Sequence, residues 1–141
     1  MEDSNMQEVS PAPKELKGIE GWLAWFVYAA LGIGGVLFNI GYFLKYAASD
    51  QILAAVICIP FIAVAIRALL LMRAEKPEGV KWAKIYLFAT AVLGALELLL
   101  VPADPSGWRI LLFGVGWLAY LFTSKRVRNT YFPQTKSDGG Q

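Results

Sequence analysis

Histidine is absent from the 141 residues of this chain, and cysteine occurs once, at Cys58. Without histidine there is no imidazole for general acid–base catalysis or for binding a metal or haem, and one thiol is too few for a thiolate cluster or an intramolecular disulfide. Charged residues are also scarce, at 17% against about 25% in an ordinary soluble domain. The net charge of +2 gives no basis for nucleic-acid binding.

No pairing of a nucleophile with a base emerges from the sequence either. None of the six serines lies inside an apolar block, and Cys58 has no ionisable neighbour at helical spacing. The glycines at 32–35 lie inside an apolar stretch with no lysine nearby, so they do not form a phosphate-binding loop. We therefore expect a protein that is not an enzyme and uses no cofactor.

Hydrophobic residues, in contrast, make up 57% of the chain and are gathered into four blocks. These blocks cover about residues 22–44, 51–72, 82–101 and 107–123. A helix of about 20 apolar residues spans the hydrocarbon core of a bilayer. The sequence therefore predicts an all-α integral membrane protein with four transmembrane helices.

The predicted transmembrane domain covers residues 18–132, between two polar segments. Residues 1–17 and 133–141 contain too little apolar surface to repay the entropic cost of folding, so we expect disordered cytoplasmic tails there. The connections between the apolar blocks are short, which favours an antiparallel up-down bundle.

The distribution of basic residues predicts the orientation of the bundle. Eleven of the 13 Lys and Arg residues lie in the two tails or around the middle connection, and the other two are Lys45 and Arg109. Because lysine and arginine are concentrated on the cytoplasmic side of membrane proteins, both termini should be cytoplasmic. An even number of spans agrees with this.

Two strings at the ends of the apolar region are more specific than composition. Leu-Lys-Gly-Ile-Glu-Gly-Trp-Leu occupies residues 16–23, and Ser-Lys-Arg-Val-Arg-Asn-Thr-Tyr-Phe occupies residues 124–132. Together they resemble the bacterial domain-of-unknown-function family numbered 2569, although Glu20 stands where the family has a small residue. The resemblance implies a small four-span protein of the bacterial inner membrane, and it implies no activity.

Polar residues inside the apolar blocks are candidate functional residues, because charge is costly in a membrane. Glu97 in the third block and Asn39 in the first are at similar predicted depth, so they could form a polar recess that binds a cation or proton. The alternative is that Glu97 reaches the outer surface or meets Lys45 or Arg109. A rise of 1.5 Å per residue along each helix places Arg67 near the cytoplasmic face of the membrane and Glu97 in its outer third. We therefore predict that Arg67 pairs with Glu20, or with Glu75, and not with Glu97.

The closing string forms a basic cluster directly after the fourth block. Its candidate docking residues for a lipid headgroup or a partner protein are Lys125, Arg126, Arg128, Asn129 and Thr130. The simpler alternative is that these charges only hold the C-terminus on the cytoplasmic side. Small residues at a spacing of four, such as Thr90 with Gly94, are expected to let the helices pack closely.

These patterns favour a non-enzymatic accessory protein of the bacterial inner membrane. Its expected partners are the bilayer and its anionic headgroups, together with a membrane protein or further copies of the same chain. Nucleic acid is not an expected partner. The alternative is a small transporter or channel with a polar site at Asn39 and Glu97.

Overall fold

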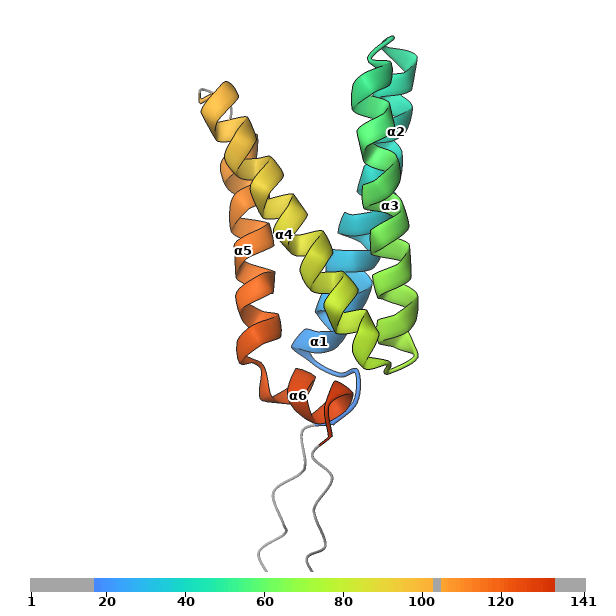
Figure 1. The fold of residues 1–141 in the computed structure, drawn as a ribbon, viewed down its shortest axis with the longest axis vertical. Helices are drawn as coiled ribbons and strands as arrows, with labels where there is room; N and C mark the ends of the chain where they lie inside the picture. The colour runs from blue at the N-terminus through green and yellow to red at the C-terminus, as the bar shows by residue number, and fades with distance from the viewer. Residues whose placement is uncertain (1–16, 103–104, 134–141) are drawn as a thin grey trace, which may run out of the picture.

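The computed structural model describes residues 17–102 and 105–133, and these residues form helices and short connections with no strand. The expected tails at 1–17 and 133–141 lie, apart from one residue each, outside the described residues. The elements are α1 (Trp22–Ala24), η1 (Trp25–Leu37), α2 (Phe38–Ala48), α3 (Ile52–Arg73), α4 (Pro77–Leu100), α5 (Ser106–Thr123) and α6 (Lys125–Tyr131). The first three join end to end into one rod, and four long rods alternate in direction (Figure 1).

The helix bounds follow the apolar blocks, with two extensions. The first rod continues four residues past the expected end at Leu44, and α4 begins five residues before the expected start at Trp82. Pro77 explains the earlier start of α4, because proline has no backbone N–H to leave unpaired in the first turn of a helix. The short helix α6 is not foreseen from the apolar pattern.

The middle of the first rod is a π-helix, η1, in which each backbone N–H bonds to the carbonyl five residues earlier. The amide of Phe38, for example, donates to the carbonyl oxygen of Ile33. This segment contains the glycines at 32–35. A Cβ on Gly35 would lie 3.0 Å from the Ala65 Cβ and 3.3 Å from the Tyr86 ring, so this glycine lets three rods approach closely.

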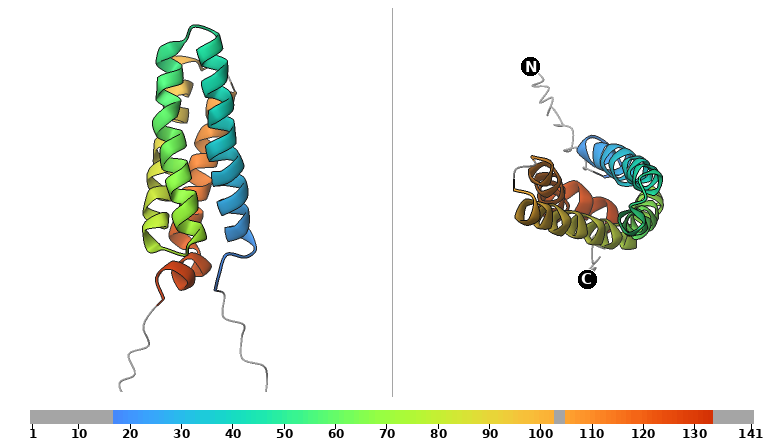
Figure 2. Two further views of the ribbon diagram at one scale, coloured as in Figure 1. Left: turned by 90° about the vertical axis from the view of Figure 1, so that its right-hand side faces the viewer. Right: turned by 90° about the horizontal axis from the view of Figure 1, so that it is seen from above.

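Seen from above, the rods form an arc in which consecutive rods are neighbours (Figure 2). The first rod and α5 stand at the ends of the arc and meet through side chains, with the Phe26 and Trp117 ring centroids 5.1 Å apart. At the end away from α6, the hairpin of α2 and α3 diverges from the hairpin of α4 and α5 (Figure 1). No residue of α2 is buried.

The core therefore sits toward the α6 end. Its largest fully buried side chains come from the first rod, the end of α3, the first half of α4 and α6: Leu23, Phe26, Val27, Leu31, Met72, Val80, Leu87 and Val127. Helices α4 and α5 also pack with their backbones in close approach. A Cβ on Gly94 would lie 2.5 Å from the Leu111 amide nitrogen, and a Cβ on Gly114 would lie 2.8 Å from the Ala91 nitrogen.

Long apolar helices with large apolar side chains on their outer surfaces suggest a location in a membrane. Three helices are long and apolar enough to cross one: Trp22–Ala48, Ile52–Arg73 and Pro77–Leu100. Helix α5 meets the same standard only together with α6, and that pair is bent by 64°. The described chain thus has three candidate spans, or four if the bent pair counts as one.

Candidate functional site

Helix α6 folds across one end of the bundle, where it contacts both α3 and the segment that precedes the first rod (Figure 1). Ser124 makes the turn: its extended backbone ends α5, and its hydroxyl oxygen accepts a hydrogen bond from the Val127 amide at 3.4 Å. A serine at this position satisfies one of the amides that a helix start leaves unpaired. The bend of 64° lays α6 across the ends of the rods instead of extending α5.

The inward face of α6 is held by two side chains. The Tyr131 hydroxyl donates to the Met72 carbonyl oxygen at 2.9 Å, near the end of α3. The Thr130 hydroxyl accepts from the Gly18 amide at 2.9 Å and lies 3.4 Å from the Gly18 carbonyl oxygen. Burial raises the pKa of the Tyr131 phenol well above its usual value, so its hydroxyl remains a donor at neutral pH. Thr130 is therefore a buried structural contact rather than part of an exposed docking surface.

The outward face of α6 is basic. Lys125, Arg128 and Asn129 are exposed, whereas the Arg126 side chain is only 19% exposed. Arg126 turns toward the segment before the first rod, where its Nη1 lies 3.5 Å from the Glu20 Oε2. The five candidate docking residues thus divide into an outward group, made by Lys125, Arg128 and Asn129, and an inward group, made by Arg126 and Thr130. We call the first group the basic face.

The expected rim pair of Arg67 with Glu20 or Glu75 is replaced by two other contacts. Glu20 meets Arg126, and the Arg67 guanidinium lies over the Trp82 ring, 4.6 Å from its centroid. A guanidinium stacks on an indole through the negative charge of the ring face. Arg67 and Trp82 belong to neighbouring helices, so their contact satisfies the arginine without a carboxylate.

Asn39 and Glu97 also have partners other than each other. The Asn39 side-chain amide donates to the Gly35 carbonyl oxygen at 2.9 Å and to the Tyr86 hydroxyl at 3.5 Å. The Glu97 Oε1 accepts from the Ser106 hydroxyl at 2.6 Å, joining α4 to α5. Asn39 lies on α2 and Glu97 near the end of α4, on the two arms that diverge in Figure 1. The structure does not bring these two residues together.

Sequence reasoning missed the partners that the fold supplies from distant segments. Tyr86 and Ser106 were not predicted as the partners of Asn39 and Glu97, because a tyrosine and a serine at helix positions carry no pattern that identifies such a contact. The inward anchor of α6 did leave a signal. Ser124, Val127 and Tyr131 recur at spacings of three and four, which is the pattern of one helix face above a capping serine.

Among the described residues there is no group of three or more His, Cys, Asp or Glu side chains that could hold a metal ion. Comparisons with protein-family models, with curated proteins and with solved structures find no match for this chain.

Proposed function

We propose that this chain is a four-span protein of the bacterial inner membrane, of the kind that its end strings resemble, and that it acts as a non-enzymatic accessory protein. In this proposal the basic face of α6 binds anionic phospholipid headgroups. The observation that carries the proposal is the bend of 64° between α5 and α6, together with the exposure of Lys125 and Arg128. A helix lying across the ends of spanning rods is at headgroup level, and its charges face outward.

The other charges of the described chain support this placement. The turn between α3 and α4 lies at the same end as α6, and it adds Arg73, Lys76 and Lys81. The opposite end carries Lys45 and Arg109. By the positive-inside rule, the α6 end is the cytoplasmic one, which places both termini in the cytoplasm. Anionic lipids are concentrated in the cytoplasmic leaflet of membranes.

The transporter alternative has less support. It requires Asn39 and Glu97 to share one recess, but Asn39 of α2 is hydrogen-bonded to Tyr86 of α4, and Glu97 is hydrogen-bonded to Ser106 of α5. Asn39 and Tyr86 alone provide a neutral amide and a neutral phenol, with no carboxylate to balance a bound cation.

The experiment compares lipid retention by the purified chain in mild detergent, measured by native mass spectrometry. Phosphatidylglycerol is titrated against phosphatidylcholine with identical acyl chains. Each basic residue near an anionic surface contributes about 1 kcal/mol to binding. The preference for phosphatidylglycerol should therefore be about 30-fold weaker in the double variant Lys125→Gln with Arg128→Gln. The loss should shrink as salt is raised.

The matched control removes the same two charges at the other end, with Lys45→Gln and Arg109→Gln. This variant should keep the preference of the wild type. An equal loss in both double variants, or no loss in the first, would contradict the proposal. Loss of a co-purified protein from the first variant, with lipid preference intact, would indicate a protein partner in place of headgroups.

A further inference from the structure

The first 16 residues of the chain are acidic, whereas the rest of the chain is basic. They contain four carboxylates and one lysine, which are Glu2, Asp3, Glu8, Glu15 and Lys14. Of the 13 basic and 11 acidic residues of the whole chain, 12 and 7 lie in residues 17–141. Residues 134–141 carry one charge of each sign. Negative charge is therefore concentrated in residues 1–16, which we call the acidic segment.

The acidic segment joins the described chain beside α6. The Gly18 amide donates to the Thr130 hydroxyl at 2.9 Å, so the chain is held against α6 two residues after the segment ends. The Glu20 Oε2 lies 3.5 Å from the Arg126 Nη1, so one carboxylate of this part of the chain already pairs with a basic residue of α6. The four carboxylates of the acidic segment are thus tethered next to the basic face.

The acidic segment is long enough to cover α6. A flexible chain of n residues has a root-mean-square length of about 5–6 Å × √n, which gives about 16–19 Å between Gly18 and Glu8. Helix α6 has seven residues. At 1.5 Å per residue its length is about 10 Å. Groups tethered at such distances meet at an effective concentration in the millimolar range, so charge pairing requires no fixed fold of the segment.

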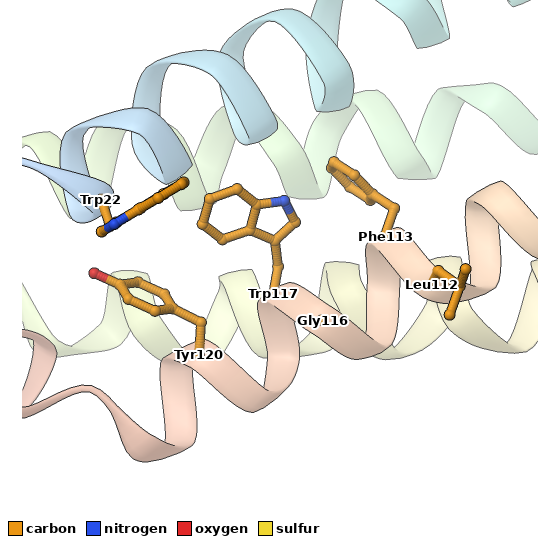
Figure 3. Close-up of a pocket in the computed structure, with 6 residues that line it drawn as sticks. All are labelled: Trp22, Leu112, Phe113, Gly116, Trp117 and Tyr120. Atoms are coloured by element: carbon orange, nitrogen blue, oxygen red, sulfur yellow. The ribbon is translucent and has the colours of Figure 1, made fainter.

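The basic face is the surface at this end that best complements the acidic segment. Lys125 and Arg128 are exposed, and α6 contains no acidic residue. The turn between α3 and α4 also has basic residues, but Glu75 and Glu78 offset their charge. The groove between the start of the first rod and α5 has no charged residue in its lining (Figure 3). Its lining residues are Trp22, Leu112, Phe113, Gly116, Trp117 and Tyr120.

We propose that the acidic segment binds the basic face of the same chain and competes there with anionic headgroups. Its carboxylates accept hydrogen bonds from Lys125 and Arg128, and these two side chains are then not free to bind a phosphate. This inference rests on the proposed function, because it assigns a regulator to the same face. An exposed ion pair changes an equilibrium by about threefold, so two pairs weaken headgroup binding by about tenfold.

An anionic bilayer acts on both partners of this contact. It attracts Lys125 and Arg128, and it repels the carboxylates of the acidic segment. A larger fraction of anionic lipid therefore favours the headgroup contact and weakens the intramolecular contact at the same time. The acidic segment makes headgroup binding depend more steeply on the anionic lipid content than the basic face does alone.

The first experiment detects the contact in the full chain with no added lipid. A carbodiimide joins a carboxylate to a lysine amine that touches it, forming an amide with loss of one water. Peptide mass spectrometry of the monomer in mild detergent should find the acidic segment joined to Lys125 more often than to Lys76 or Lys81. Lys45, at the opposite end, should give no product with the segment. Salt added before the reagent should reduce the Lys125 product.

The second experiment measures the preference for phosphatidylglycerol over phosphatidylcholine by native mass spectrometry. The neutral-segment variant replaces all four carboxylates with amides, by Glu2→Gln, Asp3→Asn, Glu8→Gln and Glu15→Gln. At low salt its preference should be about tenfold stronger than that of wild type. The effect of about 30-fold for Lys125→Gln with Arg128→Gln applies to an uncovered face. That loss should therefore appear in full in the neutral-segment variant and be about threefold in wild type, and this difference measures the coupling.

The matched control removes carboxylates from the same end of the bundle, outside the acidic segment. Glu75→Gln with Glu78→Gln changes the charge of the turn between α3 and α4. Any effect of this control on lipid preference should be the same with and without Lys125 and Arg128. A general effect of net charge is thereby distinguished from uncovering of the basic face.

Three results would overturn the proposal. The first is a Lys125 product no more abundant than those of Lys76 and Lys81. The second is a product that forms only between two copies of the chain. The third is a neutral-segment variant with the preference of wild type, and a loss on removing Lys125 and Arg128 in that variant would leave the headgroup function standing. Conversely, the Lys125 product together with no such loss would support the contact and contradict the headgroup function.

Discussion

Two glycines of α5 that are two residues apart should respond to the same substitution with opposite signs. Gly114 faces α4, and a Cβ there would lie 2.8 Å from the Ala91 nitrogen and 2.9 Å from the Leu87 carbonyl oxygen. Gly116 faces away from α4, and a Cβ there meets nothing within 4 Å. We predict that Gly114→Ala destabilises the bundle and that Gly116→Ala stabilises it slightly.

The magnitudes follow from two separate effects. Alanine is favoured over glycine inside a helix by about 1 kcal/mol, and this gain applies to both variants. At Gly114 the new methyl meets backbone atoms, which cannot rotate away as a side-chain end could. Overpacking of this kind costs about 1–3 kcal/mol. The two variants should therefore differ by about 1–3 kcal/mol in the free energy of unfolding, with Gly114→Ala the less stable.

The assay is reversible unfolding of the purified chain by increasing mole fractions of sodium dodecyl sulfate in mild detergent, followed by circular dichroism and tryptophan fluorescence. Because both variants have the same composition and the same helix, differences in detergent binding cancel in the comparison. A Gly114→Ala chain as stable as Gly116→Ala would refute the close approach of α4 and α5. It would also refute the role of small residues in this contact.

The sequence carried most of the information on helix placement because apolar length is a local property. Every apolar block became a helix, and Gly94, expected to allow close packing, is buried against α5. The contacts of polar side chains were less predictable, because they depend on how the rods diverge. Asn39 and Glu97 were predicted to lie at similar depth on straight, parallel helices. Their depth does not determine the distance between the two hairpins that carry them.

The π-helix η1 could not be predicted from residue depths that were calculated for an α-helix. A rise of 1.5 Å per residue applies to an α-helix, and a π-helical segment has one more residue in each hydrogen-bonded turn. Gly35, inside this segment, allows close packing against Ala65 and Tyr86. The choice of π over α hydrogen bonding depends on those tertiary contacts, which have no local signature.

Further predictions concern the anchor of α6, the α4–α5 contact and the orientation. Tyr131→Phe should cost about 1 kcal/mol, since one hydrogen bond is lost and the Met72 carbonyl still accepts from a backbone amide. Burial raises the pKa of Tyr131 above 10.0. The contribution of this tyrosine to the free energy of unfolding should therefore be fully present below pH 10.0 and fall as pH rises above it. When both chains are unfolded at pH values from about 8 to about 11, the fall should be smaller in Tyr131→Phe. Glu97→Gln should change the unfolding free energy by less than about 0.5 kcal/mol because its amide oxygen can still accept from Ser106, whereas Glu97→Leu should cost about 1 kcal/mol. Reporter fusions after Lys45 should read periplasmic and fusions after Tyr131 cytoplasmic, and a periplasmic C-terminus would contradict the orientation.

The two ends of the bundle differ because their rods are held by different forces. In lipid, apolar side chains gain little by leaving hydrocarbon for a protein core, so helices associate through close backbone contact and hydrogen bonds. The α6 end has both: Tyr131 and Thr130 bond α6 to α3 and to the segment before the first rod. Toward the far end the two hairpins diverge (Figure 1), and no residue of α2 is buried. Helix α6 is therefore a clamp on one end of the arc.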